Sequence, residues 1–482
     1  MARWSPNLKI PRRHAQCPGR MFNARWFALR QRVLHAATPG SLRALVWRGA
    51  VWTIAGYGAA QLLRFGSNLI LTRWLFPELF GLMVLVNTFL IGLALLSDFG
   101  IGMSIVQNRR GGEPEFLNTA WTMQVVRGML LWLSSFLLAT PFAEFYGEPI
   151  LRWLIPIAAL GALFAGFNAT SLFTLQRELR IGTLTKIELG AQASGILVML
   201  AWAWLAPNLW ALVVGMLVSA LYKLIASHRV LAGTRNRFVW DATAARAILT
   251  FGKWIFLSSA VTFFAEQSDR LILGKVVPLE MLGVYGIALA YAEVPRQITL
   301  ALAGNVLFPA FSSLRELSRP ALSEKISRKR VRVLYVLAFA VVLFAAFGDF
   351  LVRVLYDARY WQAAWMLPLL ALGLWPRLLC NTIEPALFAL GKPQYSTAGQ
   401  IARVVWTVGG TLLGFAWAGI FGAVLAIALN DVAYYCLINF GLWHEGLSEL
   451  RQDAQATFVL VLFLFVVMSA RFILGGGLPF YG

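Results

Sequence analysis

Charged side chains lie within several strongly apolar stretches of this 482-residue chain, and they are the residues whose types could do chemistry. A charge inside a membrane span costs roughly 2.5–3.5 kcal/mol on insertion scales, so such residues usually face a cavity and often pair with one another. Arginines in a cavity would bind anions, and neighbouring carboxylates would compete for them. The charged residues in apolar stretches are Arg64, Asp98, Arg127, Glu188, Glu266, Asp269, Arg270, Glu293, Arg296, Glu384, Arg403 and Asp431.

Four polar residues are spaced as if they act together. Arg64 and Asn68 are four residues apart, as are Glu266 and Arg270, so each pair lies on one helix face. Arg64 and Glu266 also lie 202 residues apart (266 − 64), as do Asn68 and Arg270 (270 − 68). We predict that Arg64 and Glu266 form an ion pair near the middle of the membrane that opens in one access state. The alternatives are a purely structural pair, or side chains that reach the interface.

The interval of 202 residues reflects an internal repeat. Trp52 matches Trp254 (254 − 52), Leu69-Ile70-Leu71 matches Leu271-Ile272-Leu273, Arg73 matches Lys275, and Gly81 matches Gly283. Pro77 and Pro278 fall one residue out of step, which a difference of one residue in a loop would produce. Two equivalent helical halves around a central site are the architecture of alternating-access transporters.

Composition independently predicts a membrane protein. The chain is 59% hydrophobic and 13% charged, with a mean hydropathy of +0.68, and a soluble protein of this size needs more charged surface. Apolar windows near the ~20 residues of a spanning helix recur along the chain. The predicted spans are 46–72, 80–106, 118–140, 151–174, 184–206, 209–228, 249–274, 282–311, 332–351, 363–389, 396–417, 419–440 and 456–474.

We therefore expect an all-α polytopic membrane protein with about 13 (12–14) transmembrane helices. The expected parts are a basic cytoplasmic tail (1–45), a first helical bundle (46–228), a cytoplasmic linker (229–248), a second bundle (249–440), and an extra helix with a tail (441–482).

The formal charge of +20 follows the loops rather than a nucleic-acid surface. Basic residues gather in alternate loops, at 107–117, 174–186, 229–247 and 312–331, and the last of these lacks interleaved aromatics. This asymmetry predicts that these loops and the amino terminus are cytoplasmic. The Arg-rich residues 1–45 would lie on anionic lipid, although a mitochondrial transit peptide is a second interpretation and a start at Met21 a third. With three cysteines, we expect neither a disulfide framework nor a metal site, and no cofactor.

The repeated segment carries a resemblance to a known family. The run from Trp52 through Leu71-Thr72-Arg73-Trp74-Leu75-Phe76-Pro77-Glu78-Leu79-Phe80-Gly81 resembles the first hairpin of the Wzx-type oligosaccharide flippases. Ser97-Asp98-Phe99-Gly100-Ile101-Gly102 and Gln107 extend the match, as do Asp269-Arg270-Leu271-Ile272-Leu273-Gly274 and Gly283-Val284-Tyr285 in the second half. The resemblance covers residues 46–445. It implies the superfamily that also contains multidrug exporters and peptidoglycan-precursor flippases.

Membership would imply two six-helix bundles related by a pseudo-two-fold axis around a central cavity. The cargo would be undecaprenyl-diphosphate-linked oligosaccharide, which crosses the bacterial inner membrane by alternating access. On this interpretation the candidate substrate-binding residues are Arg64, Asn68, Arg127, Arg270, Arg296 and Arg403. The candidates for coupling or gating are Glu266, Asp269, Asp98, Glu293 and Asp431, although Asp98 lies near a predicted helix end and is better explained by capping. Partners would be membrane lipids and, beside the transporter, a polysaccharide polymerase and a chain-length regulator.

Two other functions compete with a flippase. A multidrug exporter of the same superfamily would favour acidic cavity residues, and Arg64, Arg127, Arg270 and Arg296 argue against a purely cationic cargo. A membrane glycosyltransferase or polymerase would need a sizeable extracytoplasmic loop with acidic or histidine residues. The predicted connections on that face are short, and the chain has only four histidines, so we expect no enzyme.

Overall fold

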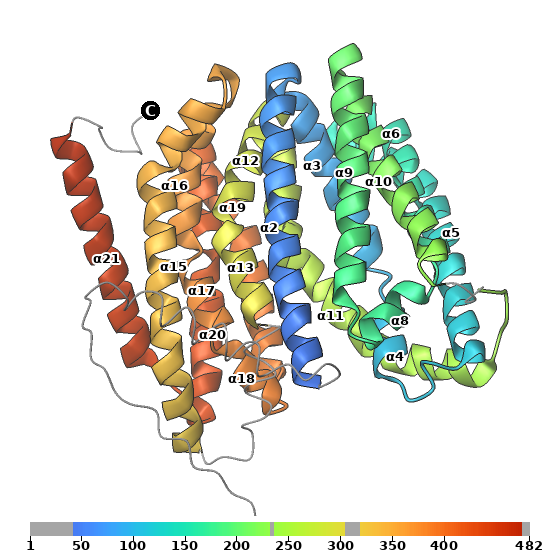
Figure 1. The fold of residues 1–482 in the computed structure, drawn as a ribbon. Coiled ribbons are helices and arrows are strands. Elements are labelled where there is room, and N and C mark those ends of the chain that lie inside the picture. The colour runs from blue at the N-terminus through green and yellow to red at the C-terminus, as the bar shows by residue number, and fades with distance from the viewer. Residues whose placement is uncertain (1–41, 232–235, 304–318, 475–482) are drawn as a thin grey trace, which may run out of the picture.

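The computed structural model describes residues 42–231, 236–303 and 319–474, which form helices and no strand (Figure 1). The first half contains α2 (Leu42–Trp74), α3 (Pro77–Leu95), α4 (Ile101–Gln107), α5 (Pro114–Tyr146), α6 (Leu151–Ala158), α7 (Leu160–Phe167), α8 (Ser171–Arg177), α9 (Ile181–Leu205) and α10 (Trp210–Arg229). The second half contains α11 (Ala242–Val276), α12 (Leu279–Ala292), α13 (Val294–Leu302), α15 (Arg319–Leu355), the 3-10 turn η2 (Ala358–Tyr360), α16 (Ala363–Gly373), α17 (Trp375–Asn381), α18 (Glu384–Ala389), α19 (Gln394–Ala428) and α20 (Asn430–His444). Helix α21 (Leu450–Ile473) follows both halves.

The chain is a multi-pass membrane protein. Among the described residues, eight helical stretches are long and apolar enough to span a membrane, or up to ten if each of two bent pairs is one span. One stretch, Gln394–His444, covers two of the predicted spans. The predicted boundary between those spans is present as a kink, with non-helical backbone at Ala418 and Gly419. The total of thirteen spans stays a prediction, and the predicted tail lies outside the described residues up to residue 41.

Four predicted spans are wrong as continuous helices. Span 80–106 is split between α3 and α4, because Gly100 adopts a left-handed conformation (φ 61°) that glycine tolerates best. Span 282–311 is split between α12 and α13, where Pro295 lies in the first turn of the new helix, and its residues 304–311 lie outside the described part. Spans 151–174 and 363–389 are each divided into three short helices. Hydropathy depends on composition, so it does not register these changes of backbone direction.

The two halves repeat one order of helices. α11 ends at Val276 and α12 begins at Leu279, each 202 residues after the end of α2 at Trp74 and the start of α3 at Pro77. The repeated glycines make reciprocal contacts between the halves. A Cβ on Gly81 would lie 2.0 Å from the carbonyl oxygen of Leu279, and one on Gly283 would lie 2.1 Å from that of Pro77. Glycine at both positions lets α3 and α12 approach at backbone distance.

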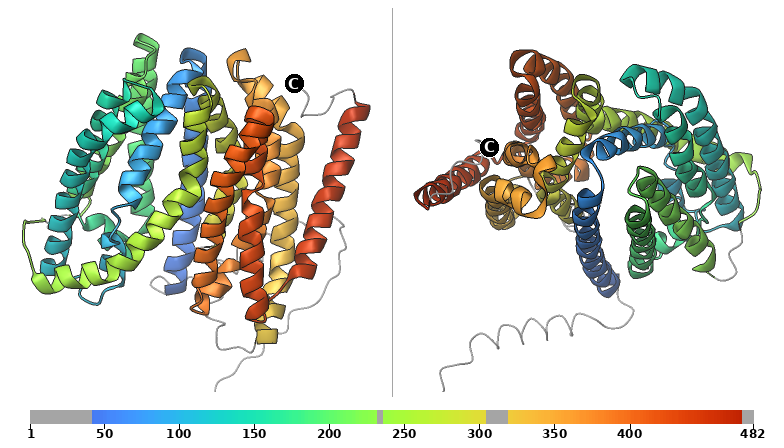
Figure 2. Two further views of the ribbon diagram at one scale, coloured as in Figure 1. Left: turned by 180° about the vertical axis from the view of Figure 1, so that it is seen from behind. Right: turned by 90° about the horizontal axis from the view of Figure 1, so that it is seen from above.

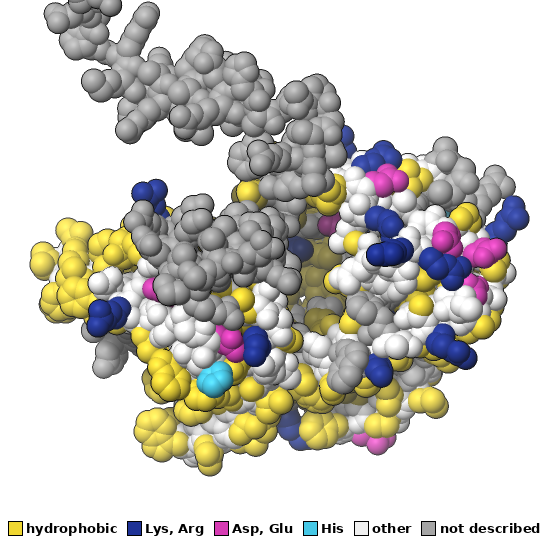
Figure 3. Space-filling model, turned by 90° about the horizontal axis from the view of Figure 1, so that it is seen from below, with side chains coloured by type: hydrophobic (Ala, Val, Ile, Leu, Met, Phe, Trp, Pro, Cys, Tyr) yellow, Lys and Arg dark blue, Asp and Glu magenta, His cyan; other side chains and the backbone are white. Residues whose placement is uncertain are grey.

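The halves are joined at one end of the molecule. A large apolar cluster there contains Leu75 and Leu85 of the first half together with Tyr285, Tyr360 and other residues of the second half. α11 crosses from beneath the first half to the second half (Figure 2). The opposite face, seen from below, is hollowed between the two halves (Figure 3). The molecule is therefore closed at one face and open at the other.

Two tyrosines fasten the closed end in a reciprocal manner. Tyr146, the last residue of α5, donates its hydroxyl hydrogen to the Leu271 carbonyl of α11 at 3.0 Å. Tyr360, just after α15, donates to the Leu75 carbonyl at the end of α2, also at 3.0 Å. Each half therefore reaches across to the first long helix of the other. We call these two contacts the tyrosine clamps.

A cation supports each clamp. Arg359 donates to the carbonyls of Thr72 and Arg73 at 3.2 and 3.3 Å, a favourable place for a cation because a helix carboxyl end carries partial negative charge. In the other half, Lys275 donates to the Phe145 carbonyl.

Three predicted cytoplasmic loops lie on one face, because they contact one another. Arg177 Nη1 donates to the Asn108 carbonyl at 2.6 Å, which joins the loops at 174–186 and 107–117. Arg110 Nη2 lies 3.3 Å from Asp241 Oδ2, which joins the second of these to 229–247. Asp241 caps α11, and hydrogen bonds from the Thr243 hydroxyl and backbone lower the pKa of its carboxyl group, with a smaller contribution from Arg110. This face is the one that includes α4 and α8 at the bottom of Figure 1.

Helix α21 packs along α15 and is held by an ion pair near each end. Asp453 Oδ1 lies 2.6 Å from Arg330 Nη2, and both side chains are under 5% exposed. Arg471 Nη1 donates to Asp349 Oδ1 at 2.6 Å. Since α21 lies outside the repeat, these pairs fix an additional helix to the second half.

Candidate functional site

A pocket of about 580 Å³, part of it open to solvent, lies within the second half. Its lining comes from six segments: α11 (Glu266, Gln267, Asp269, Arg270), α12 with the residue after it (Leu289, Glu293), α13 (Arg296), α16 (Leu370, Gly373, Leu374), α19 (Arg403, Ile427, Ala428) and α20 (Asn430, Asp431). Seven of the eleven candidate residues from the sequence line this pocket. They are Arg270, Arg296, Arg403, Glu266, Asp269, Glu293 and Asp431.

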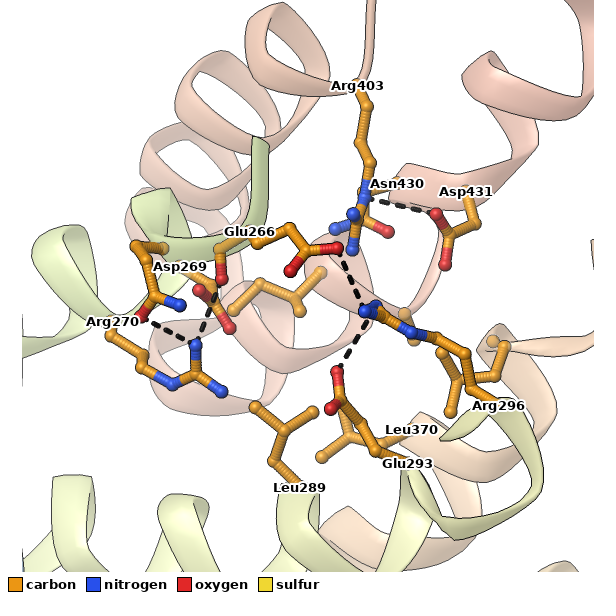
Figure 4. Close-up of a pocket in the computed structure, with 15 residues that line it drawn as sticks. Glu266, Asp269, Arg270, Leu289, Glu293, Arg296, Leu370, Arg403, Asn430 and Asp431 are labelled. Atoms are coloured by element: carbon orange, nitrogen blue, oxygen red, sulfur yellow. Dashed lines mark hydrogen bonds and ion pairs between the residues drawn. The ribbon is translucent and has the colours of Figure 1, made fainter. Parts of the chain in front are cut away.

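Arg296 lies between two carboxylates of the pocket (Figure 4). Its Nη2 lies 2.9 Å from Glu266 Oε1, and its Nη1 lies 3.5 Å from Glu293 Oε1. The Arg296 side chain is 7% exposed, whereas that of Glu266 is 32% exposed. The chain break after Ala292 starts α13 in a new direction and brings Arg296 to Glu266. The predicted partner of Glu266 was Arg64, so that assignment is wrong for this structure.

A second ion pair joins α19 to α20. Arg403 Nε lies 3.0 Å from Asp431 Oδ1, and the two side chains are 8% and 2% exposed. The separation is that of a close ion pair, but neither atom satisfies the angular requirement of a hydrogen bond. The charges therefore attract one another without good alignment, which makes this pair easier to exchange than a bidentate one.

Arg270 and Asp269 are held by neutral partners. Arg270 Nη1 donates to the Glu266 carbonyl at 2.9 Å and to the side-chain oxygen of Gln267 at 2.8 Å. Asp269 accepts a hydrogen bond from the Tyr285 hydroxyl at 2.5 Å. No ion pair to Arg270 is present among the described residues, so this cation can accept an anionic ligand without displacing a carboxylate.

Four candidates lie outside the pocket. Arg64 is exposed on α2, and Asn68 donates to the Tyr356 hydroxyl at 3.3 Å. Asp98 accepts from the Gly100 backbone at 2.9 Å, the capping role favoured by the sequence. Arg127 donates to the Ser97 hydroxyl at 3.1 Å and to the Ala94 carbonyl at 2.6 Å. These two residues stabilise the end of α3, so their roles in cargo binding and coupling have no geometric support.

Sequence reasoning missed Arg377, which lies behind the pocket on α17. Its guanidinium carbon lies 3.9 Å from the centre of the Tyr434 ring. Tyr434 in turn donates to Glu384 at 2.5 Å, and Ser396 donates to the same carboxylate oxygen at 2.6 Å. Arg377 falls within the predicted span 363–389, so the rule that charges inside spans face polar surroundings would have identified it.

The pocket can bind a polar, charged ligand. Three arginines and four carboxylates line it, so its charge is nearly balanced and an anion must compete with internal carboxylates. Within the described part of the chain, no group of three or more histidine, cysteine or acidic residues could hold a metal ion.

Two halves of apolar helices, a closed end, a hollowed face and a charged pocket define an all-α membrane protein with a transporter fold. The same fold occurs in "Lipid II flippase MurJ, inward closed conformation", with a TM-score of 0.69 and 12% identity, covering 87% of this chain and 92% of that one. It also occurs in an inward-facing multidrug resistance MATE family transporter of the MOP superfamily (TM-score 0.61, 14% identity, 83% and 95% covered).

Sequence comparison separates these possibilities further. Residues 70–365, more than half of the chain, match the family model described as "Polysaccharide biosynthesis protein", and the chain belongs to this family. It is 25% identical over 411 residues to the succinoglycan biosynthesis transport protein ExoT of Rhizobium meliloti (strain 1021), covering 83% of this chain and 79% of that protein. It is 27% identical over 284 residues to the lipopolysaccharide biosynthesis protein WzxC of Escherichia coli (strain K12), covering 57% and 56%. The family resemblance of the repeated segment is confirmed.

Proposed function

We propose that this protein is a flippase that moves polyprenyl-diphosphate-linked oligosaccharide across the bacterial inner membrane for polysaccharide biosynthesis. The charged pocket beside the hollowed face is the observation that carries the proposal. A sugar chain and a diphosphate must avoid hydrocarbon, and this pocket supplies cations and polar groups within the protein. The transport and lipopolysaccharide biosynthesis proteins to which the chain is similar support the same cargo class.

The mechanism we propose is alternating access between the hollowed face and the closed face. For cargo to leave on the other side, the tyrosine clamps and the glycine contacts between α3 and α12 must separate. Cargo would shift this equilibrium if it binds one state more tightly than the other. The ion pairs of Arg296 and Arg403 provide that difference, because cargo can exchange with their carboxylates.

The basic residues support an orientation with the hollowed face toward the cytoplasm. The loops at 107–117, 174–186 and 229–247, which contact one another, are rich in arginine, as expected for cytoplasmic loops. Cysteines introduced at Ser327 should be protected from an impermeant reagent added outside, and those at Glu148 or Tyr360 should react. Labelling of Ser327→Cys from outside would reverse the orientation.

Deletion of the gene tests the cargo. We expect export of a surface or secreted polysaccharide to stop and lipid-linked repeat units to accumulate on the cytoplasmic side. The second candidate function is a multidrug exporter, which the shared fold of the MATE transporter favours. Normal polysaccharide export combined with increased drug sensitivity would support that alternative and contradict the flippase proposal.

Partners and the absence of catalysis belong to the same proposal. A flippase breaks no bond, so we expect no enzymatic activity and no cofactor. A polysaccharide polymerase and a chain-length regulator would act on the cargo after it crosses the membrane. Co-purification of either protein with this one would test a direct contact.

A further inference from the structure

Arg377 is a buried cation whose hydrogen-bonding capacity is not used. The residue is 6% exposed, yet its Nε and Nη1 atoms have no hydrogen-bond partner among the described residues. A buried donor without an acceptor is costly, so most such groups are paired. Arg377 lies against the Tyr434 ring, and Glu384 and Ser396 hold the Tyr434 hydroxyl. The guanidinium is therefore positioned but has free donors.

Asp431 lies on the same helix face as the ring that holds Arg377. Asp431 and Tyr434 are three residues apart on α20, a spacing that places both side chains on one side of the helix. The carboxylate of Asp431 contributes to the electrostatic environment of Arg377. Asp431 is therefore flanked by two arginines, Arg403 from α19 and Arg377 from α17.

The present partner of Asp431 is the arginine that faces the pocket. Arg403 lines the pocket and is close to Asp431 without hydrogen-bond alignment, whereas Arg377 lies behind the pocket. If an anionic ligand took Arg403 and nothing else changed, Asp431, at 1% exposure, would become an unpaired buried charge. Such a charge would strongly oppose ligand binding.

We propose that Arg377 is the second partner of Asp431. When the diphosphate of the cargo binds Arg403, the Asp431 carboxylate passes to the free donors of Arg377, and no buried charge is left unpaired. Arg377 is thus a positioning residue that acts through Asp431 and does not contact the cargo. The inference rests on the proposed function, since it assumes an anionic cargo in the pocket.

Binding of undecaprenyl diphosphate to the purified full chain in nanodiscs tests the inference. The variants are Arg377→Gln, Asp431→Asn and the double variant. Arg377→Gln should bind about tenfold more weakly or worse, because the displaced carboxylate has no partner. The double variant should bind within about threefold of Asp431→Asn, because no carboxylate is left to be stranded. Arg377→Lys keeps the charge and should lose little affinity.

The outcomes separate this inference from its alternatives. Wild-type affinity in Arg377→Gln would overturn it, as would a double variant that binds much more weakly than Asp431→Asn, because a direct or packing role of Arg377 is not suppressed by removing the carboxylate. If Arg377→Gln does not accumulate, comparison of the double variant with Asp431→Asn still decides. The matched control removes another buried pair, Arg330→Gln with Asp453→Asn, and should bind like the wild type. A wild-type protein that does not bind the diphosphate would overturn the proposed function itself.

Discussion

In the second half, Arg296 and Arg403 are each under 10% exposed and lie within 3.0 Å of a carboxylate on another helix. In the first half, the ion pairs lie at the surface, as between Arg152 and Glu144, whose side chains are 47% and 62% exposed. Yet the halves repeat the same order of helices, and their glycines make reciprocal contacts. The repeated scaffold supplies the joint between the halves, whereas the charges available for cargo are concentrated in one of them.

This asymmetry changes the expected division of labour. Buried ion pairs contribute little net stability but are costly to break, so they suit a role in which a ligand exchanges partners. Surface pairs are screened by solvent and contribute little either way. We therefore expect substitutions in the second half to alter cargo binding and those at the joint to alter the access equilibrium. The first half should tolerate substitutions of its surface charges.

The largest effect is expected for Arg296→Gln, which leaves Glu266 and Glu293 without their cation. Breaking a buried pair typically costs about 3–5 kcal/mol. The 32% exposure of Glu266 lowers the expected cost to about 2 kcal/mol through solvent screening. Export should be lost and protein abundance should fall, as measured by polysaccharide assay and immunoblot. Arg296→Lys, which keeps the charge, is the control.

A charge exchange identifies the partner of Glu266 directly. Glu266→Arg combined with Arg296→Glu should restore abundance better than either single change. Arg64→Glu combined with Glu266→Arg should not, because Arg64 is exposed on α2 and forms no ion pair with a described residue. Restoration by the Arg64 combination alone would return the pair to the position expected from the repeat.

The next effect compares equivalent positions of the two halves. Arg270→Ala should reduce export about tenfold at normal abundance, because it removes the pocket arginine that no carboxylate holds, and one charge-assisted hydrogen bond is worth about 1.5–3 kcal/mol. Arg64→Ala should have a smaller effect, since Arg64 lies outside the pocket. Equal losses in the two variants, measured as export per unit of inserted protein, would show that cargo uses both halves alike.

A smaller change is expected at the tyrosine clamps. Tyr146→Phe and Tyr360→Phe each remove one hydrogen bond, worth about 1 kcal/mol or roughly a fivefold shift in an equilibrium. The double variant should favour opening of the closed face. Reaction of Thr72→Cys with an impermeant maleimide, which is slow while Thr72 is buried, should speed up. Unchanged labelling in the double variant would exclude the clamps as part of the gate.

The smallest effect is expected for Arg152→Gln in the first half. Its ion pair with Glu144 is exposed, and exposed pairs contribute about 0–1 kcal/mol. Export and abundance should stay within about twofold of the wild type, a change below ~0.5 kcal/mol. A strong loss of export would break the contrast between the two halves.

The sequence predicted much of the scaffold. The 202-residue repeat fixed the ends of α2 and α11 and the starts of α3 and α12, because the same residues end and begin helices in both copies. The cost of charge in hydrocarbon selected seven residues that line the pocket, including Arg270, Arg296 and Asp431. The same argument included Asp98 and Arg127, which stabilise the end of α3 instead, because a helix end can satisfy a polar group without any cavity.

The tertiary structure alone decided which charges meet. The pairing of Glu266 with Arg296 depends on the break after Ala292, which is a change of backbone direction that an apolar window does not register. The position of Arg377 behind Asp431 depends on how α17 and α20 cross. Hydropathy and spacing describe neighbours along one helix, so they place residues on a face. Contacts between helices depend on crossing and backbone breaks, which arise only when the whole chain is packed.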